Sequence, residues 1–544
     1  MAWLGVDLGT QSVRAVLVGG PDAAAAGIGA GVGARSRTEN GTGAGAVLGR
    51  GAAPLRSRRW DDGRHEQDPE SWWTAVADAT RQALAQSGAA EIDGVACCGT
   101  SGTVLLVEET ADDPARPLTP GLMYDDARAV AEAALVEREP APVWSELGLT
   151  PQRTWALPKA LWLVRHALGA ATAPGPSPRW APGPAPGTGS GGAAAGASPD
   201  GGPGRVRLAH QVDVITSRLI GQPAPADTSH ALKTGVDPLT AAWPYDDLVR
   251  LGLDPGVLPR VVRPGTVLGG VCRAAAERTG IPEGVPVVAG MTDGCAAQIA
   301  AGVLGPGQWG FVLGTTTVLK GVSAQLLHDP TGALYSHRSP DGFWWPGGAS
   351  SAGAGVLNQE FDPDDFPGLE GLAAAREPAG CLTYPLVSPG ERFPFRRPDA
   401  RRLTLGTPRD DADRFAAILQ GVGYVQRLCL DHLRALGASV GNPITVTGGA
   451  TRSAYWTQLQ ADILRRDVAV PRYAEGAVGM AVLAASTVHG LPAAAERMTG
   501  PATVFHPRDG THFDEPYARL VTELERRGWI DRRLAQSALA GAAT

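Results

Sequence analysis

Lysine is nearly absent from this 544-residue chain. Of its 48 lysine and arginine residues, only Lys159, Lys233 and Lys320 are lysines. Together with 72 glycines and 45 prolines, this indicates a compositional bias of the whole chain, so a single arginine carries little weight as a functional signal. The formal net charge of -7 is small for this length and argues against a nucleic-acid-binding surface as the main function.

Cysteine is also scarce, and long apolar runs are missing. Six cysteines stand at positions 97, 98, 272, 295, 381 and 429, and none has the spacing of metal ligands, so we expect free thiols in a reducing compartment. The chain has no apolar run of about 18 residues and no basic leader, which predicts a cytoplasmic protein without a membrane partner. A G-x-x-x-x-G-K-[ST] motif does not occur, which excludes a P-loop.

The length predicts two large α/β halves, since one core rarely serves more than about 250 residues. Two stretches, about 21–55 and 170–204, consist mainly of Ala, Gly, Pro and Ser, and we expect flexible insertions there. The pattern of apolar runs restarts near residue 263. We therefore expect an N-terminal domain over 1–262 and a C-terminal domain over 263–544.

The most informative stretch covers residues 285–302. An apolar run, 285–288, predicts a buried strand, and the Ala-rich segment that follows predicts a helix ending at Gly302. Asp293 lies at the turn between them, where a carboxylate is available as a general base. The alternative is that Asp293 only caps the helix, which is the usual role of a lone Asp at such a position.

Two hairpins with glycine and hydroxyl residues at their turns are predicted, one in each half. The first joins strands at 3–6 and 13–18, and the second joins strands at 309–313 and 317–322. Successive N–H groups and hydroxyls at such turns bind phosphate oxygens, so we expect each half to hold one side of a polyphosphate. The turn residues concerned are Asp7, Thr10, Gln11 and Ser12 in the first hairpin and Gly314, Thr315 and Thr316 in the second.

Three further loops carry polar or small residues. Thr100 and Ser101 lie on a turn between strands expected at 92–97 and 103–107, where hydroxyls bind a polyol or only form a glycine turn. Gly448, Gly449 and Ala450 follow a predicted strand at 444–447, and such a glycine pair lets a ring or ribose lie against the backbone. The loop 123–128 (MYDDAR) has the charges typical of a solvated surface.

In this order, the pieces resemble the FGGY carbohydrate kinases, a branch of the actin/Hsp70/sugar-kinase superfamily. The resemblance covers nearly all of the chain outside the two insertions. The motifs that carry it are 7–14 (DLGTQSVR), 66–73 (EQDPESWW), 159–162 (KALW), 290–294 (GMTDG), 313–316 (LGTT) and 447–450 (TGGA). Within the family, the D-ribulokinase branch of cyanobacteria and plants is resembled by 99–106 (GTSGTVLL), 319–320 (LK), 335–337 (YSH), 347–350 (GGAS) and 390–394 (GERFP).

The resemblance implies two ribonuclease-H-like domains flanking a central cleft, with a ketopentose on the first and MgATP on the second. It implies that Asp293 removes a proton from the sugar hydroxyl, that Asp7 holds the Mg²⁺ shell, and that Ser101 contacts the sugar. Thr10 and the turn at 314–316 are implied to bind phosphate, and the glycines at 448 and 449 to pack on adenosine.

The sequence thus predicts an ATP-dependent kinase for a ketopentose, D-ribulose before D-xylulose, acting as a monomer or homodimer on a small sugar. A kinase for another ketose or a polyol is the alternative within this class. The alternative from another class is a non-catalytic, actin-like protein that senses ATP or sugar, and an intact Asp293 with both phosphate turns argues against it.

Overall fold

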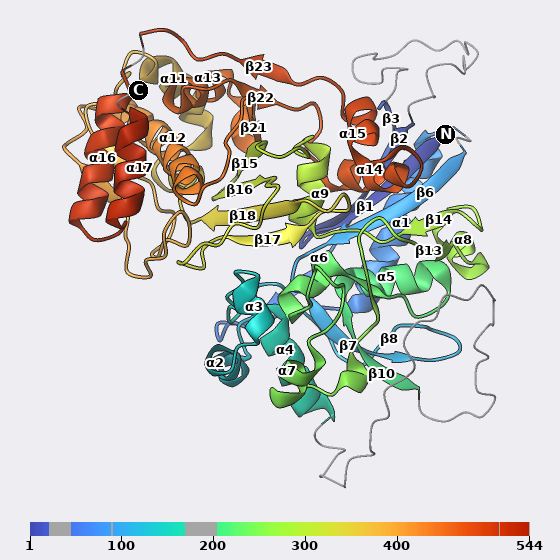
Figure 1. Ribbon diagram of the computed structural model, residues 1–544. Coiled ribbons are helices and arrows are strands. Elements are labelled where there is room, and N and C mark those ends of the chain that lie inside the picture. The colour runs from blue at the N-terminus through green and yellow to red at the C-terminus, as the bar shows by residue number, and fades with distance from the viewer. Residues whose placement is uncertain (21–44, 89–90, 169–203, 511, 543–544) are drawn as a thin grey trace, which may run out of the picture.

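Two mixed β-sheets and a smaller lobe make up the protein (Figure 1). The computed structural model describes residues 1–20, 45–88, 91–168, 204–510 and 512–542. The segment 170–203, for which an insertion was expected, lies outside the described residues, as does most of 21–46. Among the described helices, none is long and apolar enough to cross a lipid bilayer.

The first sheet has six described strands in the order β13-β14-β6-β1-β2-β3. They are β1 (Ala2–Leu8), β2 (Ser12–Gly19), β3 (Val47–Pro54), β6 (Ile92–Gly99), β13 (Val267–Gly270) and β14 (Pro286–Val288). Strands β1 and β2 form the expected hairpin, and β1, β6 and β14 run parallel. The carboxyl ends of the three parallel strands therefore meet at one edge of the sheet.

The insertion predicted at 21–55 is wrong for its last part, because β3 is a strand of the first sheet paired with β2. Its glycines serve packing against α1 (Pro69–Gln86). A Cβ atom on Gly49 would lie 2.0 Å from the carbonyl oxygen of Ala83, and one on Gly51 would lie 1.9 Å from that of Ala79. The glycine-rich composition that suggested disorder instead lets a helix approach the strand closely.

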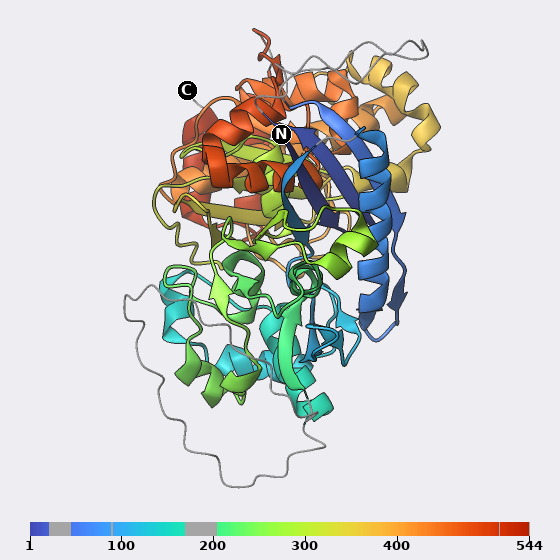
Figure 2. The same cartoon turned by 90° about the vertical axis from the view of Figure 1, so that its right-hand side faces the viewer.

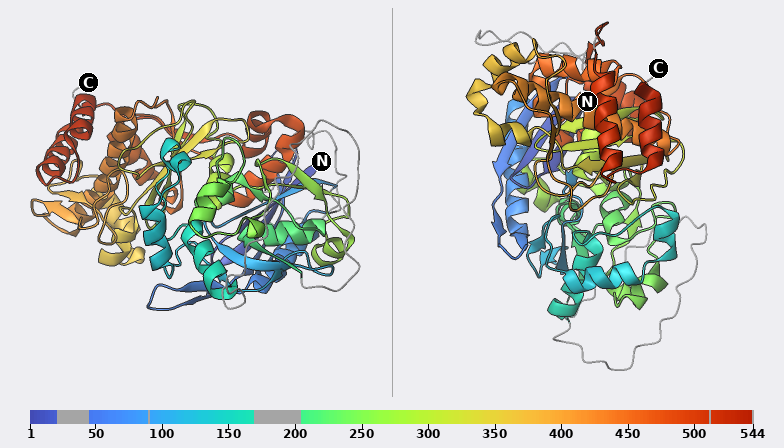
Figure 3. Two further views of the ribbon diagram at one scale, coloured as in Figure 1. Left: turned by 60° about the horizontal axis from the view of Figure 1, so that its bottom comes forward. Right: turned by 90° about the vertical axis from the view of Figure 1, so that its left-hand side faces the viewer.

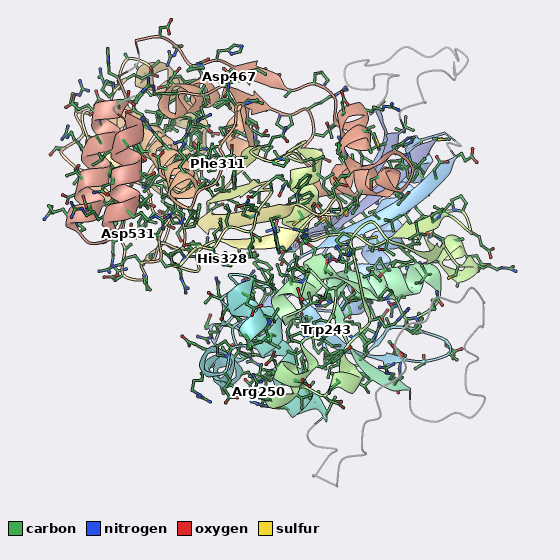
Figure 4. All side chains as sticks on the ribbon, in the orientation of Figure 1. Trp243, Arg250, Phe311, His328, Asp467 and Asp531 are labelled. Carbon is green, nitrogen blue, oxygen red and sulfur yellow. The ribbon has the colours of Figure 1, made fainter. Side chains whose placement is uncertain are left out.

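A smaller lobe surrounds the second sheet, which has the strand order β10-β7-β9-β5-β4 with β8 beside β7. Its strands are β4 (Ser57–Arg59), β5 (His65–Gln67), β7 (Val104–Glu109), β8 (Arg116–Pro117), β9 (Gly121–Leu122) and β10 (Arg205–His210), and β11 (Ala226–Asp227) pairs separately with β12 (Val261–Val262). Its helices are α2 (Val130–Arg138), α3 (Pro142–Glu146), α4 (Ala156–Leu163), α6 (Thr228–Ala231) and α7 (Tyr245–Arg250). Trp243 lies within the core of this lobe (Figure 4).

The third sheet has seven described strands in the order β17-β18-β16-β15-β21-β22-β23. They are β15 (Trp309–Leu313), β16 (Thr317–Gly321), β17 (Tyr335–Arg338), β18 (Trp344–Ser350), β21 (Ile444–Thr447), β22 (Val468–Val470) and β23 (Thr503–Phe505). Strands β15 and β16 form the second expected hairpin, and β15, β21 and β22 run parallel. The strand directions of β16, β15, β21 and β22 repeat those of β2, β1, β6 and β14 in the first sheet. The two halves therefore contain the same structural unit.

Helices cover the third sheet on the side where Phe311 is buried (Figure 4). They are α10 (Gly355–Glu360), α11 (Phe366–Ala373), α12 (Asp411–Ala435), α13 (Ala454–Leu464), α16 (Asp514–Arg526) and α17 (Arg532–Ala542), and the pair β19 (Leu382–Tyr384) and β20 (Leu403–Leu405) joins them. Helices α16 and α17 stand at the end of the molecule away from the first sheet (Figure 3).

The first sheet is covered on both faces. Helix α1, with α5 (Gln211–Ile220) and α8 (Arg273–Thr279), packs on one face. The other face holds α9 (Asp293–Ala300), α14 (Gly476–His489) and α15 (Leu491–Thr499), so the C-terminal part of the chain returns to the N-terminal sheet (Figure 2). Glycine again permits the close approach, since a Cβ on Gly5 would lie 1.7 Å from the carbonyl oxygen of Ala477.

The expected domain boundary at residue 262 differs from the division between the sheets. Strands β13 and β14 follow that residue but belong to the first sheet, beside β6. The division between sheets falls after β14, and α14 crosses back over it. The restart of the apolar pattern near residue 263 marks the entry of the chain into β13, which extends the first sheet.

Replacing Gly5 by Ala is expected to destabilise the protein, because the added Cβ meets the backbone of α14 and neither element can move aside. Overpacking of this kind costs on the order of 1–3 kcal/mol, and the measurement is the melting temperature. Gly371→Ala in α11 is the matched control, since no atom lies within 4 Å of its Cβ position, and helix propensity predicts an unchanged or raised melting temperature there. An unchanged melting temperature for Gly5→Ala would contradict the proposed contact.

Candidate functional site

The carboxyl ends of β1, β6 and β14 bring three of the predicted residues to one edge of the first sheet. Asp7 lies opposite Cys98 in the register of β1 and β6. A bridge between Gly99 and Thr292 continues the parallel pairing of β6 beyond β14. Asp7, Ser101 and Asp293 therefore leave neighbouring strands at the same edge, where ligands bind in open α/β sheets.

Asp293 is the first residue of α9, and Thr292 occupies the N-cap position. Asp293 is therefore not the N-cap residue itself, and the choice between a general base and a purely structural role remains a matter for experiment. Its Oδ1 accepts a hydrogen bond of 2.7 Å from the N–H of Gly294, and its side chain is partly exposed. The backbone before it is fixed by Ser229, whose Oγ accepts a 3.2 Å hydrogen bond from the N–H of Thr292. An oriented, accessible carboxylate at this edge is suited to accept a proton.

Asp7 has an unusual electrostatic environment. Burial, and then the neighbouring carboxylate of Asp293, raise the pKa of Asp7 to about 6, although the thiol of Cys98 donates to its Oδ1 at 3.3 Å. Gly476, at the start of α14, faces it, since a Cβ there would lie 3.1 Å from Asp7 Oδ2. Two carboxylates that repel each other at a strand edge form a place that favours the binding of a cation.

The turn after β6 separates the roles of its two hydroxyls. Thr100 is buried, and its Oγ1 bonds Gln211 Oε1 at 2.9 Å and Thr103 Oγ1 at 2.5 Å. Because these contacts hold the hydroxyl inside the protein, Thr100 shapes the turn. The Oγ of Ser101 has no hydrogen-bond partner among the described residues, while the carbonyl oxygen of Ser101 accepts a 3.2 Å bond from Lys233 Nζ. Of the two hydroxyls, only the buried Oγ of Ser101 is thus not committed to a bond within the described residues.

In the second half, the turn between β15 and β16 is braced by the residues before α10. The N–H groups of Ala354 and Gly355 donate to the carbonyl oxygens of Gly314 and Thr315 at 3.1 and 3.0 Å. Gly353 must be a glycine, because a Cβ there would lie 2.5 Å from the carbonyl oxygen of Thr315. The turn is therefore held rigid, which a phosphate site requires.

Gly448, directly after β21, lies against the same turn. Its φ of +98° is in the left-handed region, and a Cβ would lie 2.3 Å from the carbonyl oxygen of Leu313. Only glycine satisfies both conditions without strain. The ends of the parallel strands β15 and β21 consequently meet, as the ends of β1 and β6 do in the first sheet.

A cavity of about 870 Å³ opens beside these two strand ends. Of the residues predicted to bind nucleotide, Gly314, Thr315, Gly449 and Ala450 line it. Its other walls come from α10, α11, α12 and α13 and are largely apolar, with Phe366, Phe415, Leu419 and Trp456 among them. The volume and the apolar walls suit a ring such as a nucleobase, with the backbone of the turns beside it.

The turn of the first hairpin is not part of this cavity. Thr10, Gln11 and Ser12 do not line that cavity, and Thr10 and Ser12 are partly exposed. The turn is tied to the lobe by Gln67 Nε2, which donates to the carbonyl oxygen of Thr10 at 2.6 Å. It is tied to the residue directly after β3 by a bond from the N–H of Leu55 to the carbonyl oxygen of Gln11 at 2.8 Å. These two bonds fix the turn, whose first residue of interest, Thr10, lies three residues after Asp7 in the chain.

The prediction that the loop 123–128 forms a solvated surface is wrong. Asp126 is fully buried, and Arg128 donates to it and to Glu66, each at 2.7 Å. Lys159 Nζ donates to the carbonyl oxygen of Met123 at 2.7 Å, and burial lowers the pKa of Lys159 to about 7. The network connects motif 66–73 with motif 159–162, which no periodicity in the sequence indicated.

The three lysines each support a part of the candidate site, which the sequence patterns did not indicate. Lys159 supports the loop 123–128, Lys233 holds the Ser101 turn, and Lys320 reaches the first turn of α9, with its Nζ 3.5 Å from the Sγ of Cys295. In a chain that otherwise uses arginine, all three lysines lie around the edge that carries Ser101 and Asp293. The positions of the three lysines are therefore a more specific indication of this site than the position of any single arginine.

Comparison with known proteins agrees with this geometry. The N-terminal domain model of the FGGY family of carbohydrate kinases matches residues 40–173, and the C-terminal domain model matches residues 307–488. A xylulose kinase of Streptomyces rubiginosus is 29% identical over 527 residues, which cover 94% of each chain. A xylulose kinase of Streptomyces coelicolor is 30% identical over 502 residues, 90% of this chain and 89% of the other. These names do not support the ribulokinase branch that the motifs suggested.

Solved structures share the fold. The crystal structure of a xylulose kinase from Rhodospirillum rubrum matches with a TM-score of 0.75 and 23% identity, covering 97% of this chain and 99% of the other. Plasmodium falciparum glycerol kinase with ADP matches with a TM-score of 0.75 and 16% identity, covering 97% of both chains. The expected architecture of two α/β domains of the sugar-kinase and actin-like type is confirmed, and the chain is a carbohydrate kinase that belongs to the FGGY family.

Proposed function

We propose that this protein transfers the terminal phosphoryl group of ATP to a hydroxyl of a ketopentose. The observation that carries the proposal is the pairing of two strand-end sites: Asp7, Ser101 and Asp293 on the first sheet, and the braced turn beside the 870 Å³ cavity on the third. D-Xylulose is the first candidate, because the similar Streptomyces proteins carry that name. D-Ribulose is the second, on the motifs 99–106 and 319–320.

In the proposed reaction, Asp293 accepts the proton of the attacking sugar hydroxyl while Ser101 Oγ holds another hydroxyl of the sugar. The turn at Gly314–Thr316 and the turn at Thr10–Ser12 bind the phosphates from opposite halves, and Gly448, Gly449 and Ala450 pack on adenosine. Phosphoryl transfer depends mainly on such positioning and on charge neutralisation. Two half-sites that meet only on closure also exclude water, which limits hydrolysis of ATP.

The residues present fit one Mg²⁺ ion. No group of three or more potential ligand side chains occurs among the described residues, but Mg²⁺ in phosphoryl-transfer sites usually takes one or two carboxylates and completes its shell with phosphate oxygens and water. Asp7, half-buried and repelled by Asp293, is the carboxylate for this role. When bound, the ion would neutralise charge on the phosphates.

The direct test is release of ADP on adding D-xylulose, D-ribulose, L-ribulose and glycerol with MgATP. We expect kcat/KM to be highest for one of the two D-ketopentoses. A higher value for glycerol would overturn the ketopentose assignment, and no release with any sugar would favour a non-catalytic sensor.

Asp293→Asn is expected to lower kcat by about 10²- to 10⁴-fold, the usual loss on removing a general base, while MgATP still binds. Asp467→Asn is the control, since Asp467 lies between α13 and β22, away from the strand-end sites (Figure 4), and its side chain bonds only Asn442 and His506 among the described residues. A near wild-type kcat for Asp293→Asn, measured by coupled ADP release, would remove Asp293 from the proton transfer.

Ser101→Ala is expected to raise KM for the sugar several-fold and to leave KM for ATP nearly unchanged. The reason is loss of one neutral hydrogen bond, worth about 1 kcal/mol. If Ser101 only shapes its turn, the melting temperature falls instead and both KM values stay at wild type, so kinetics and a thermal melt distinguish the two roles.

A further inference from the structure

Lys320 is the cation that enters the site from the opposite half. It lies on β16 of the third sheet, and its Nζ is 3.5 Å from the Sγ of Cys295, in the first turn of α9. Unlike Lys159 and Lys233, it donates to no carbonyl oxygen, and the described residues give it no carboxylate within ion-pairing distance. The ammonium charge of Lys320 is therefore not neutralised by an ion pair within the described residues.

The path of the Lys320 side chain is built by two glycines. A Cβ on Gly347, its partner across β18, would lie 3.3 Å from Lys320 Cγ. A Cβ on Gly294, the residue after Asp293, would lie 2.8 Å from Lys320 Cε. Both positions stay without side chains so that the lysine can extend past them to the start of α9. Such a channel fixes where the ammonium lies.

A cation at this place is electrostatically unfavourable by itself. The N-terminus of a helix carries partial positive charge, which repels an ammonium, and burial also opposes the charge. Neighbouring Cys295, Tyr335 and Asp293 outweigh the burial and raise the pKa of Lys320. Among these neighbours, the carboxylate is Asp293, at the edge of the first sheet.

We propose that Lys320 is a positioning residue for the phosphoryl transfer: its ammonium balances the carboxylate of Asp293 and, through Cys295, holds the first turn of α9 in place. Since β16 belongs to the third sheet, this contact ties the start of α9, and with it Asp293, to the half that carries the braced turn. This inference rests on the proposed function, in which Asp293 accepts the proton.

The test compares Lys320→Met and Lys320→Ala with the wild type. We expect kcat to fall on the order of 10²-fold in both, the loss typical of removing one preorganised charge or donor, with KM for ATP within about twofold of wild type. Propylammonium replaces the deleted atoms in Lys320→Ala and is expected to restore part of kcat in a saturable way, while the same concentration of potassium does not. Arg338→Met is the control, because it removes a cation that lies over Trp344 and belongs to β17, the strand beyond β18 in the same sheet, and is expected to keep the wild-type kcat.

A kcat within about threefold of wild type in Lys320→Met overturns the inference, as does a folded Lys320→Ala whose kcat is low and does not respond to propylammonium. If Lys320→Met fails to fold, Lys320→Gln, which keeps a polar end, is measured in its place by the same criteria. The rates are taken with whichever sugar the wild type phosphorylates. A wild type inactive on ketopentoses counts against the proposed substrate class, whereas the ratio of variant to wild type concerns Lys320 alone.

Discussion

Close contact between backbones is the constraint on which the arrangement of the site depends. Helix α14 lies so near to β1 and α9 that Gly5 and Gly479 have no room for a side chain, and a Cβ on Gly479 would lie 1.9 Å from the carbonyl oxygen of Ala296. Gly290 has the same relation to Cys97, at 1.8 Å. These contacts fix α9 between the two large sheets. The position of Asp293, the first residue of α9, follows from them.

The repeated unit in the two halves decides which atoms face the ligands. In each half, a hairpin is followed by parallel strands whose carboxyl ends meet at one edge. The first edge presents carboxylates and a serine hydroxyl, and the second presents glycine turns beside an apolar cavity. A sugar needs directed polar groups and a nucleotide needs backbone N–H groups with an apolar wall, so one architecture provides for both substrates.

Charge near the site is distributed unevenly between the two halves. Burial, and then repulsion from the carboxylate of Asp293, raise the pKa of Asp7 on the first half. The lysine that approaches them comes from the third sheet. Attraction between this ammonium and Asp293 therefore links β16 to the start of α9, in addition to the apolar packing of α9 and α14, and it is strongest where water is excluded.

The sequence by itself determined the local structures: both hairpins, the strand and helix around Asp293, and the glycine turns, because each depends on short-range patterns of apolar residues, glycine and hydroxyls. Only the tertiary structure decided which of these pieces meet. The glycine-rich segment at 47–54 became a strand because α1 packs on it, Asp126 became buried through Glu66 and Arg128, and β13 and β14 joined the first sheet rather than the second half. Lys320 reached α9 across the cleft for the same reason, since long-range contacts have no signature in local periodicity.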